Sequence, residues 1–571
     1  MTGGVVIHDL SVRQRSVLEV TTENPFVLSV AIFASIGGFL FGYDQGVISG
    51  VLTMESFGYQ FPQIYADPNA KGWFVSSFLL TAWFGSLLNG QITDKIGRRN
   101  SMIAAVAVFL MGSGLQAIAI TTFIMFVGRI VAGLSVGMLT MVVPLYMAEI
   151  SPPEIRGGLV VLQQMSITVG ILVAFWIDYF CNYIGGTRCS PNRPYSNGVA
   201  FSPFTDVGPE GCQQSAMAWR LPLGAQMLPG AILGIGMFFM PYSPRWLLMM
   251  GKDEDALFDL ARIRRKPIDS NAIKEEFIQI RSEVLFEQLS RAEKFGMAKG
   301  YKLEILQYRE ILSSKSSFKR VFIGSAIMFL GQFMGCNALI YYAPTIFAQL
   351  GLGGNTTSLL ATGVYGTLNC LGTFVALILI DSRGRRILLM WGAVGTGVSL
   401  IFVAAIIGTH QDSLASSPIA AWLGVLFIYV YDVNFAYSWA AVCWVLPSEI
   451  FPLAIRAKGI SITTSSTWMN NFIIGLASPI MLERYTYRTY IFFAFFCLVA
   501  FFFAKHIVPE TRQKSLEDMD AVFGDHTAAR DKQRLLEIAA GLEEDLTENE
   551  EEDRVQRGGG VSAPLVDLDE E

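Results

Sequence analysis

Apolar runs of about 20 residues recur along most of this 571-residue chain. Each run is long enough to cross the hydrocarbon core of a bilayer as an α-helix. Charged residues make up only 16% of the chain, against about 25% in a typical soluble protein. The sequence therefore predicts an all-α membrane protein with twelve transmembrane helices. The expected spans are 27–50, 73–92, 101–120, 123–148, 159–180, 219–240, 321–347, 358–380, 387–408, 419–445, 457–480 and 487–507.

A polar stretch rich in Lys, Arg and Glu separates the sixth expected span from the seventh and divides the chain into two six-helix halves. Segments of this stretch, such as Glu275–Glu287, indicate amphipathic surface helices. Lys and Arg in the short loops after the second, fourth, eighth and tenth spans place those loops, and both termini, in the cytoplasm. The predicted domains are a cytoplasmic N-terminus (1–25), an N-terminal half (26–246), a cytoplasmic amphipathic-helix loop (247–318), a C-terminal half (319–510) and an acidic cytoplasmic tail (511–571).

The two halves resemble each other in their short motifs. Three matched pairs occur in the same order, after the second, fourth and sixth span of each half. Repeats of this kind build transporters whose substrate site lies at the membrane midplane between the halves. The pairs are Gly90–Arg99 with Asp381–Arg386, Ala148–Gly157 with Ser448–Ala457, and Pro241–Arg245 with Pro509–Arg512.

One carboxylate lies near the middle of the first apolar span, within Gly37–Gly50. This residue is Asp44, and a charge at that depth costs about 2.5–3.5 kcal/mol on the lenient insertion scale. Such residues face a bundle interior or a water-filled path and have a partner. Arg129, in the fourth span, is the expected partner, so we predict an intramembrane Asp44–Arg129 pair on a substrate path.

The segments expected outside the cell carry two features. The loop between the fifth and sixth spans contains Cys181, Cys189 and Cys212 in an oxidising compartment, and a Cys189–Cys212 bridge is one pairing that these residues allow. Asn355 begins an Asn-Thr-Thr glycosylation sequon, although a sequon this close to the membrane can also stay unused.

Several other functions find no support in the sequence. The chain has no phosphate-binding loop, no metal-binding spacing and no nucleophile–base set. We therefore expect no enzyme activity, no cofactor, no metal and no nucleic-acid partner.

The motif combination is similar to the sugar porters of the major facilitator superfamily, with the fungal hexose and pentose transporters nearest in character. The resemblance spans about residues 27–515 and is carried by Phe41–Asp44, the doubled basic loops, Pro447–Pro452 and Tyr341–Pro344. It implies the major facilitator fold, with a monosaccharide and a proton as partners in the lipid bilayer. We expect function as a monomer. The lack of a vacuolar or reticular address favours the plasma membrane over an internal membrane.

In that family, acidic and basic motif residues at the cytoplasmic helix ends form ion pairs that hold the outward-open state. The basic residues could instead serve only to set topology, but topology needs no acids, and the acids recur in both halves. The matching positions for this cytoplasmic gate are Asp94, Arg98, Glu149, Arg156, Asp381, Arg385, Glu449 and Arg456.

The family's sugar site uses amides and an indole, which suit a polyol because amides both donate to and accept from hydroxyls. Any one intramembrane amide could instead link helices. The matching positions are Gln164, Gln332, Asn337, Asn369 and Trp444. This chain departs from the family at Gly331, Ala440, Ala441, Thr467 and Tyr242, which leaves the preferred sugar open.

The resemblance also implies a coupling mechanism. In proton-coupled relatives the first-span aspartate accepts the proton and the fourth-span arginine modulates it, so we assign these roles to Asp44 and Arg129. The predicted function is uptake of a hexose or pentose by alternating access with sugar/proton symport. The alternatives are facilitated diffusion, transport of a polyol, inositol or sugar acid, and a sugar sensor that does not transport.

Overall fold

The computed structural model describes residues 25–152, 156–196, 201–296, 300–352, 355–410, 417–452, 455–512, 519, 522–524 and 530–544. Within these ranges the protein is a bundle of long, roughly parallel helices, and no strand occurs there. The predicted all-helical class is confirmed for these residues. Residues 1–24, which make up nearly all of the expected N-terminal segment, lie outside the described residues.

The first expected span of the first half consists of two helices, α2 and α3, which meet at Ser35. The last span of this half is also split, into α10 and α11, at Gln226. The elements are α2 (Pro25–Ala34), α3 (Ile36–Val51), α6 (Pro68–Ile96), α7 (Arg98–Ala117), α8 (Thr122–Ile150), α9 (Arg156–Cys181), α10 (Met217–Ala225) and α11 (Met227–Met237).

The second half repeats this order. Its first span breaks between α16 and α17 at Gly335, where φ is +97°, and a Cβ at this glycine would lie 2.8 Å from the Phe493 ring. Only glycine fits such a position without strain. The elements are α16 (Lys315–Phe333), α17 (Cys336–Gln349), α18 (Asn355–Arg383), α19 (Arg385–Thr409), α20 (Pro418–Tyr437), α21 (Trp439–Ile450), α22 (Arg456–Tyr485) and α23 (Tyr487–His506).

Each of the twelve expected spans overlaps one of these helices or helix pairs. Nine helical stretches of the described residues are long and apolar enough to cross a membrane on composition alone. The exceptions are the expected spans 73–92, 219–240 and 457–480. Polar residues lower the mean hydropathy of α6 and α22. The expected span 219–240 is divided at Gln226 into two short helices, α10 and α11. The count of twelve crossings stays a prediction.

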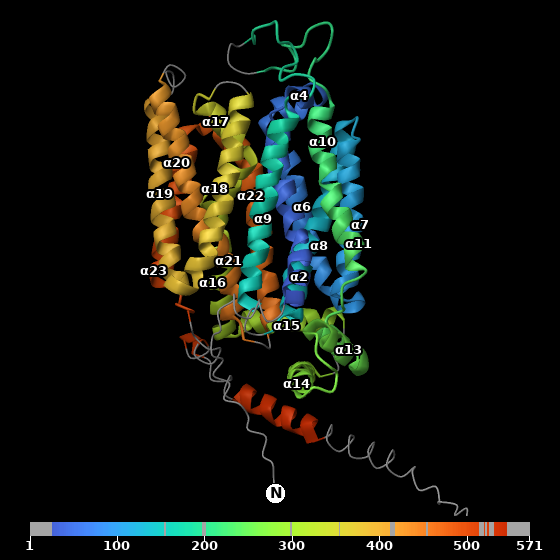
Figure 1. Ribbon diagram of the computed structural model, residues 1–571. Helices are drawn as coiled ribbons and strands as arrows, with labels where there is room; N and C mark the ends of the chain where they lie inside the picture. The colour runs from blue at the N-terminus through green and yellow to red at the C-terminus, as the bar shows by residue number, and fades with distance from the viewer. Residues whose placement is uncertain are drawn as a thin grey trace, which may run out of the picture.

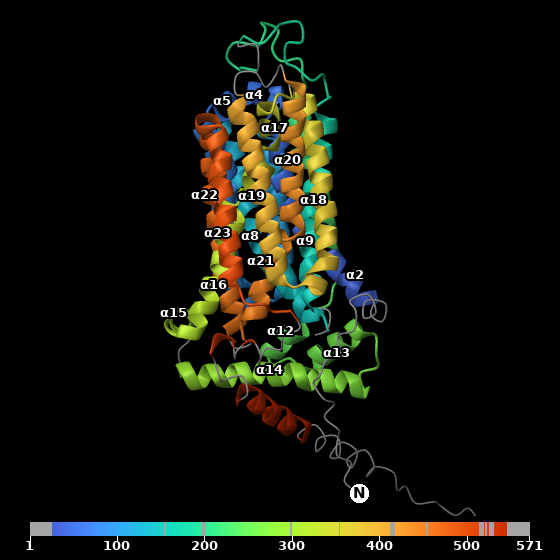
Figure 2. The ribbon, with the colours of Figure 1, turned by 90° about the vertical axis from the view of Figure 1, so that its left-hand side faces the viewer.

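Short helices lie across one end of the bundle, which we call the helical-loop end (Figure 1). Figure 2 shows the longest of them, α14, running across this end. Its buried residues include Ile273 and Phe277, and its exposed residues include Glu275 and Arg291. The amphipathic role of this segment stays a prediction. The elements are α12 (Pro244–Met249), α13 (Asp253–Arg264), α14 (Asn271–Phe295) and α15 (Tyr301–Ser313).

The opposite end, which we call the disulfide end, carries the long loop after α9 (Figure 1). A disulfide joins Cys189 to Cys212 in this loop, so the pairing that the sequence allowed is present, and Cys181 is a free, buried thiol. The loop covers two short helices that follow α3, namely α4 (Glu55–Gln60) and α5 (Pro62–Ala66).

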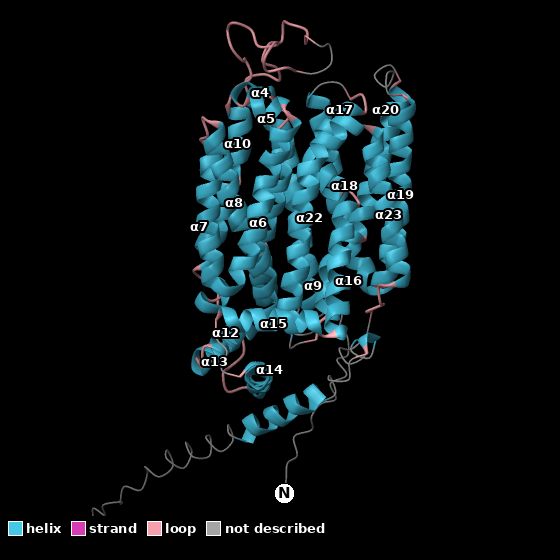
Figure 3. Cartoon of the chain, turned by 180° about the vertical axis from the view of Figure 1, so that it is seen from behind, coloured by secondary structure: helices cyan, strands magenta, loops and turns pink. Residues whose placement is uncertain are grey.

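The halves meet along two seams. In one seam α6 packs against α22, and Figure 3 shows these helices side by side. In the other, α9 packs against α18. Each seam contains a tryptophan whose indole donates across it: Trp83 Nε1 to Ser465 Oγ at 2.6 Å, and Trp176 Nε1 to Thr367 Oγ1 at 3.2 Å. These seams bring residues far apart in the sequence to the centre of the bundle.

Candidate functional site

The predicted intramembrane pair is formed. Arg129 Nη1 on α8 lies 3.0 Å from Asp44 Oδ1 and 2.8 Å from Asp44 Oδ2 on α3. Both side chains are buried, at 1% and 0% exposed. The Arg129 guanidinium also lies over the ring of Phe78, 4.4 Å from its centroid. An ion pair held this deep can persist only because each charge has its partner.

The neighbour of Asp44 reaches into the other half of the molecule. Gln45 Nε2 donates to the hydroxyl of Tyr341, on α17, at 2.9 Å. The same hydroxyl lies 3.3 Å from Oδ1 and 3.2 Å from Nδ2 of Asn471, on α22. One buried phenol therefore joins α3, α17 and α22. Consecutive residues of α3 thus hold the ion pair within the first half and a polar link between the halves.

The five residues predicted to bind sugar lie on five helices, which belong to four of the expected spans. Gln332, at the end of α16, accepts a hydrogen bond from Asn337 Nδ2 across the break at Gly335. Asn369 on α18 is buried and donates through Nδ2 to Asp432 Oδ1 at 2.6 Å. Gln164 on α9 and Trp444 on α21 are half-buried. The helix break thus brings together two of these amides, while the role of all five in sugar binding stays a prediction.

Sequence reasoning did not single out two further buried carboxylates, Asp178 on α9 and Asp432 on α20. Asp178 is 0% exposed and lies against the backbone of Gly50 on α3. Asp432 is 1% exposed. The signal that pointed to Asp44, an acidic residue inside an apolar span, was present at both positions.

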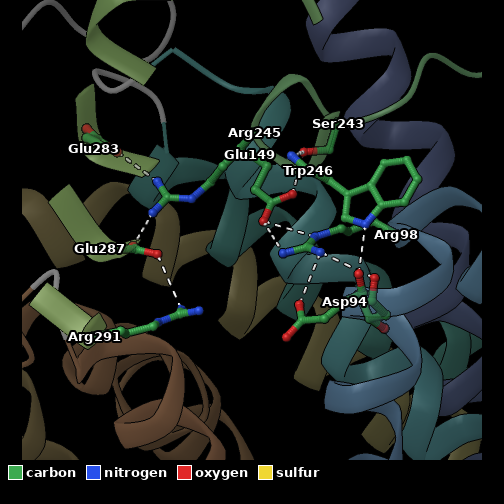
Figure 4. A network of polar contacts seen from close by, with 10 residues as sticks. Asp94, Arg98, Glu149, Ser243, Arg245, Trp246, Glu283, Glu287 and Arg291 are labelled. Carbon is green, nitrogen blue, oxygen red and sulfur yellow. Dashed lines mark hydrogen bonds and ion pairs between the residues drawn. The ribbon is translucent and has the colours of Figure 1, made fainter. Parts of the chain in front are cut away.

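The predicted ion pairs of the first half lie at the helical-loop end (Figure 4). Arg98 Nη2 lies 2.8 Å from Glu149 Oε1, and Arg98 Nη1 lies 3.2 Å from Asp94 Oδ1. Ser243, just before α12, donates to the other oxygen of Glu149. The indole of Trp246 donates to the backbone oxygen of Asp94 at 3.0 Å. These contacts join α6, α7, α8 and α12.

The second half repeats this arrangement. Arg385 Nη2 lies 2.8 Å from Glu449 Oε1, and Thr511 donates to Glu449 Oε2, as Ser243 does to its counterpart. One position differs between the halves. Glu510 accepts the backbone N–H groups of Arg385 and Arg386 at 3.0 and 3.1 Å, at the start of α19. A carboxylate there suits the positive end of the helix dipole.

In the first half, Tyr242 takes the place that Glu510 has in the second. Its ring stacks on the Arg99 guanidinium, 4.5 Å from the centroid, and on the Trp246 indole. Its backbone N–H donates to Asp259 on α13 at 3.1 Å. The departure from the family motif therefore exchanges an acid at the start of α7 for a cation–π contact.

The Pro241–Arg245 motif of the first half also connects to the helical loop. Arg245 contacts Glu283, at 2.7 Å, and Glu287, both on α14 (Figure 4). Burial works against the charge of Arg245, but Glu287 and Glu283 outweigh it and raise the pKa of Arg245. The guanidinium is therefore a permanent cation that fixes α14 to the bundle.

Four predicted residues have side chains outside the described residues. Arg156 and Arg456 begin α9 and α22, Asp381 lies near the end of α18, and Asn355 is the first residue of α18. Their predicted roles remain untested.

At the disulfide end, the buried acid Glu55 holds the loop after α9. Glu55 Oε1 accepts the hydroxyl of Tyr195 at 2.7 Å, and Glu55 Oε2 accepts the backbone N–H of Cys189 at 2.5 Å. Burial raises the pKa of Glu55, and these hydrogen bonds only partly offset the effect. The loop is thereby attached to the helix that follows the first span.

Comparison with known proteins decides the family. The model described as "Sugar (and other) transporter" matches residues 30–523, which is most of the chain. The chain belongs to the sugar porters of the major facilitator superfamily. Its family and its fold are those of transporters rather than of enzymes, and it is a multi-pass membrane protein.

Relatives of this sugar porter carry different names. It is 32% identical over 517 residues to the probable glucose transporter rco-3 of Neurospora crassa, covering 87% of this chain and 79% of that protein. It is 34% identical over 493 residues to the probable metabolite transport protein CsbC of Bacillus subtilis, covering 86% and 93%. It is also 32% identical over 507 residues to a probable quinate permease of Aspergillus fumigatus, covering 86% of each.

A solved structure is similar along nearly the whole bundle. This is the proton:xylose symporter XylE bound to 6-bromo-6-deoxy-D-glucose, with a TM-score of 0.66 and 26% identity, covering 87% of this sugar porter and 99% of XylE. The inward-open conformation of XylE from E. coli matches with a TM-score of 0.64. The predicted resemblance to sugar porters is confirmed.

Proposed function

We propose that this sugar porter takes up a neutral monosaccharide, a hexose or a pentose, by proton symport and alternating access. The observation that carries the proposal is the buried pair between Asp44 and Arg129. An intramembrane ionisable residue that faces the bundle interior marks a transport path or a proton relay. A relative in the same fold is described as a proton:xylose symporter, which supports the same mechanism here.

Proton coupling would follow from making and breaking this pair. When the halves move so that Arg129 separates from Asp44, the carboxylate loses its counter-charge and binds a proton from outside. When the pair re-forms, Arg129 displaces the proton toward the inside. The contact from neighbouring Gln45 to Tyr341 ties this event to the packing of the second half.

The ion pairs at the helical-loop end act in this proposal as the cytoplasmic gate. Arg98 with Glu149, and Arg385 with Glu449, each connect two helices of one half. They would hold the helical-loop end closed while the opposite end opens, and they would separate when the halves rock the other way. Networks of this kind bias a two-state equilibrium even when each contact contributes little.

The substrate site favours a neutral polyol on chemical grounds. Its predicted members are amides and an indole, and amides pair with hydroxyl groups. The names of some relatives raise a sugar acid such as quinate as the second candidate. Arg129, the cation that a carboxylate substrate would need, already pairs with Asp44. This favours neutral substrates.

The direct test is uptake of labelled glucose, xylose and quinate in cells that lack their own hexose carriers, with and without a protonophore. Symport predicts accumulation that the protonophore abolishes, together with alkalinisation of the medium when sugar is added. Uptake that stops at equilibrium and ignores the protonophore would make the protein a facilitator. Uptake of quinate alone would refute the neutral-sugar proposal.

The proposed orientation places the helical-loop end in the cytoplasm and the disulfide end outside the plasma membrane. An oxidised Cys189–Cys212 pair suits the outer compartment. If Asn355 carries a glycan, Asn355→Gln will remove the mobility shift that endoglycosidase causes. If antibodies bind a C-terminal tag in intact cells, the proposed orientation is wrong.

A further inference from the structure

An exposed apolar stripe follows one side of α11 and of the turn after it. It consists of Leu228, Ile232, Ile235 and Phe239, which recur at helical spacing and are each at least 48% exposed. From Leu228 to Phe239 the stripe covers about 16 Å, or about half the thickness of a hydrocarbon core. It therefore matches one leaflet of a bilayer, and Phe239 lies at the level where lipid headgroups begin.

Exposed cations meet this level at the end of α13, which lies just beyond the end of α11 (Figure 1). Arg262 Nη2 donates to the backbone oxygen of Phe239 at 3.3 Å. The Arg265 guanidinium lies over the ring of Phe26, at the start of α2, 4.9 Å from its centroid. Lys266 follows and is also exposed. The end of α13 therefore presents positive charge beside the ends of α2 and α11.

These three cations have no carboxylate partner within the part of the chain that the structure describes. Arg264, by contrast, is paired with Glu276 on α14 and turns away from this group. Asp259, one turn before Arg262, is 8% exposed, and its carboxylate accepts the backbone N–H of Tyr242 at 3.1 Å. The exposed cations therefore remain available to an anionic partner.

The backbone of Arg265 gives independent support for a role of its side chain. Arg265 caps the end of α13 in the left-handed conformation, with φ +52° and ψ +42°. Glycine is the usual residue at such a place, because a side chain is strained there. Strained residues of this kind concentrate at functional positions. The chain thus has an arginine where a glycine would fold more easily.

We propose that Arg262, Arg265 and Lys266 bind the phosphate of an anionic phospholipid whose acyl chains lie along the α11 stripe. Basic clusters at the membrane ends of helices attract anionic lipids, and a guanidinium pairs with phosphate through two parallel hydrogen bonds. Phe258, one turn before Arg262, is 60% exposed and adds an aromatic ring to the same interface. The inference does not depend on the substrate that the porter carries.

A lipid at this place would hold the helical loop against the bundle. Arg264 donates to the backbone oxygen of Ile150, at the end of α8, at 2.9 Å, and its pair with Glu276 connects α13 to α14. The competing explanation is that the cations only set the topology and complement the dipole at the end of α13.

Native mass spectrometry of the purified full-length protein separates these explanations. The probes are dioleoylphosphatidylglycerol, which is anionic, and dioleoylphosphatidylcholine, which is neutral, and retained lipids are counted at each concentration. The site variant combines Arg262→Gln, Arg265→Gln and Lys266→Gln. The matched control combines Arg530→Gln, Lys532→Gln and Arg534→Gln, which remove as much charge from the helical segment 530–544, farther from the bundle (Figure 1).

The site variant should bind phosphatidylglycerol at least tenfold more weakly than the native protein, because each cation near the surface contributes. Its binding of phosphatidylcholine, and both lipids in the control, should change less than twofold. Excess glycerol 3-phosphate, which lacks acyl chains, should not displace the lipid. Arg265→Gly should weaken phosphatidylglycerol about fivefold while Tm stays the same or rises, since glycine relieves the backbone.

Equal losses in the site variant and the control would overturn the site and assign lipid binding to overall charge. Equal native affinity for the two lipids would refute the role of the phosphate charge, and displacement by glycerol 3-phosphate would refute the role of the α11 stripe. If the site variant does not fold, Arg265→Gly decides, and unchanged phosphatidylglycerol binding in that variant refutes the proposal.

Discussion

Arg129 contacts both carboxylate oxygens of Asp44 through the single nitrogen Nη1, at 3.0 and 2.8 Å. The contact joins α8 to α3, and the next residue of α3, Gln45, binds Tyr341 of the second half. Asp44, whose charge changes when it binds a proton, is therefore adjacent in sequence to Gln45, which contacts the other half. In the proposed symport, this geometry would connect proton binding to the motion of the two halves.

Replacing Asp44 by Asn should abolish accumulation of sugar but leave equilibration across the membrane. One proton crossing 100 mV supplies about 2.3 kcal/mol, enough for about fifty-fold accumulation, and the amide cannot carry that proton. The intracellular-to-extracellular ratio of labelled sugar measures the effect at equal membrane abundance. Asp178→Asn, in the same half, should accumulate sugar normally. An Asp44→Asn protein that still concentrates sugar would rule out this role.

The two halves of the gate should differ in strength. The side chains of Arg98 and Glu149 are 5% and 6% exposed, whereas those of Arg385 and Glu449 are 10% and 26% exposed. Breaking a buried pair costs about 3–5 kcal/mol, and water reduces that cost for the more exposed pair. Glu149→Gln should therefore open the helical-loop end more than Glu449→Gln does.

Thiol labelling of a cysteine introduced on the inner part of α21 would measure this opening. Labelling rates should rise in the order native, Glu449→Gln, Glu149→Gln. Equal rates in all three proteins would show that these pairs do not hold the closed state.

The Tyr341 hydroxyl should stabilise the packing of α17 against the first half. Tyr341→Phe leaves Gln45 and Asn471 without this partner in a buried site, which costs about 1–3 kcal/mol. Hydrogen exchange along α17 should speed up by about tenfold, because each 1.4 kcal/mol is a factor of ten. The control is Tyr342→Phe, since the Tyr342 hydroxyl bonds Gly475 within the second half. Equal exchange in both variants would contradict the prediction.

The outer loop should be attached more firmly in acid than at neutral pH. Burial raises the pKa of Glu55 above its ordinary value of 4.5, so the folded loop binds a proton more tightly than the unfolded chain does. Its contribution to stability is therefore largest below pH 4.5 and declines as the pH rises through the raised pKa.

Thermal unfolding of the purified protein between about pH 4 and pH 8 tests this expectation. The fall in Tm across that interval should be smaller in Glu55→Gln than in the native protein. Glu210→Gln, at an exposed position of the same loop, should keep the native profile. A Glu55→Gln profile that parallels the native one would assign the pH dependence to other groups.

The sequence by itself determined the helical class, the approximate positions of the long helices and the family. Length and hydropathy act locally, so runs such as 27–50 and 387–408 can be assigned without knowledge of their neighbours. The doubled motifs also located Arg98, Glu149, Arg385 and Glu449 correctly at helix ends, where they pair.

Only the tertiary structure decided which polar residues meet. Gln45 and Tyr341 are 296 positions apart, and Asn369 and Asp432 are 63 apart, so their contacts depend on how the helices rotate and pack. No local pattern records that rotation. The same holds for Asp432 and Tyr365, which lie next to each other only because α20 packs against α18.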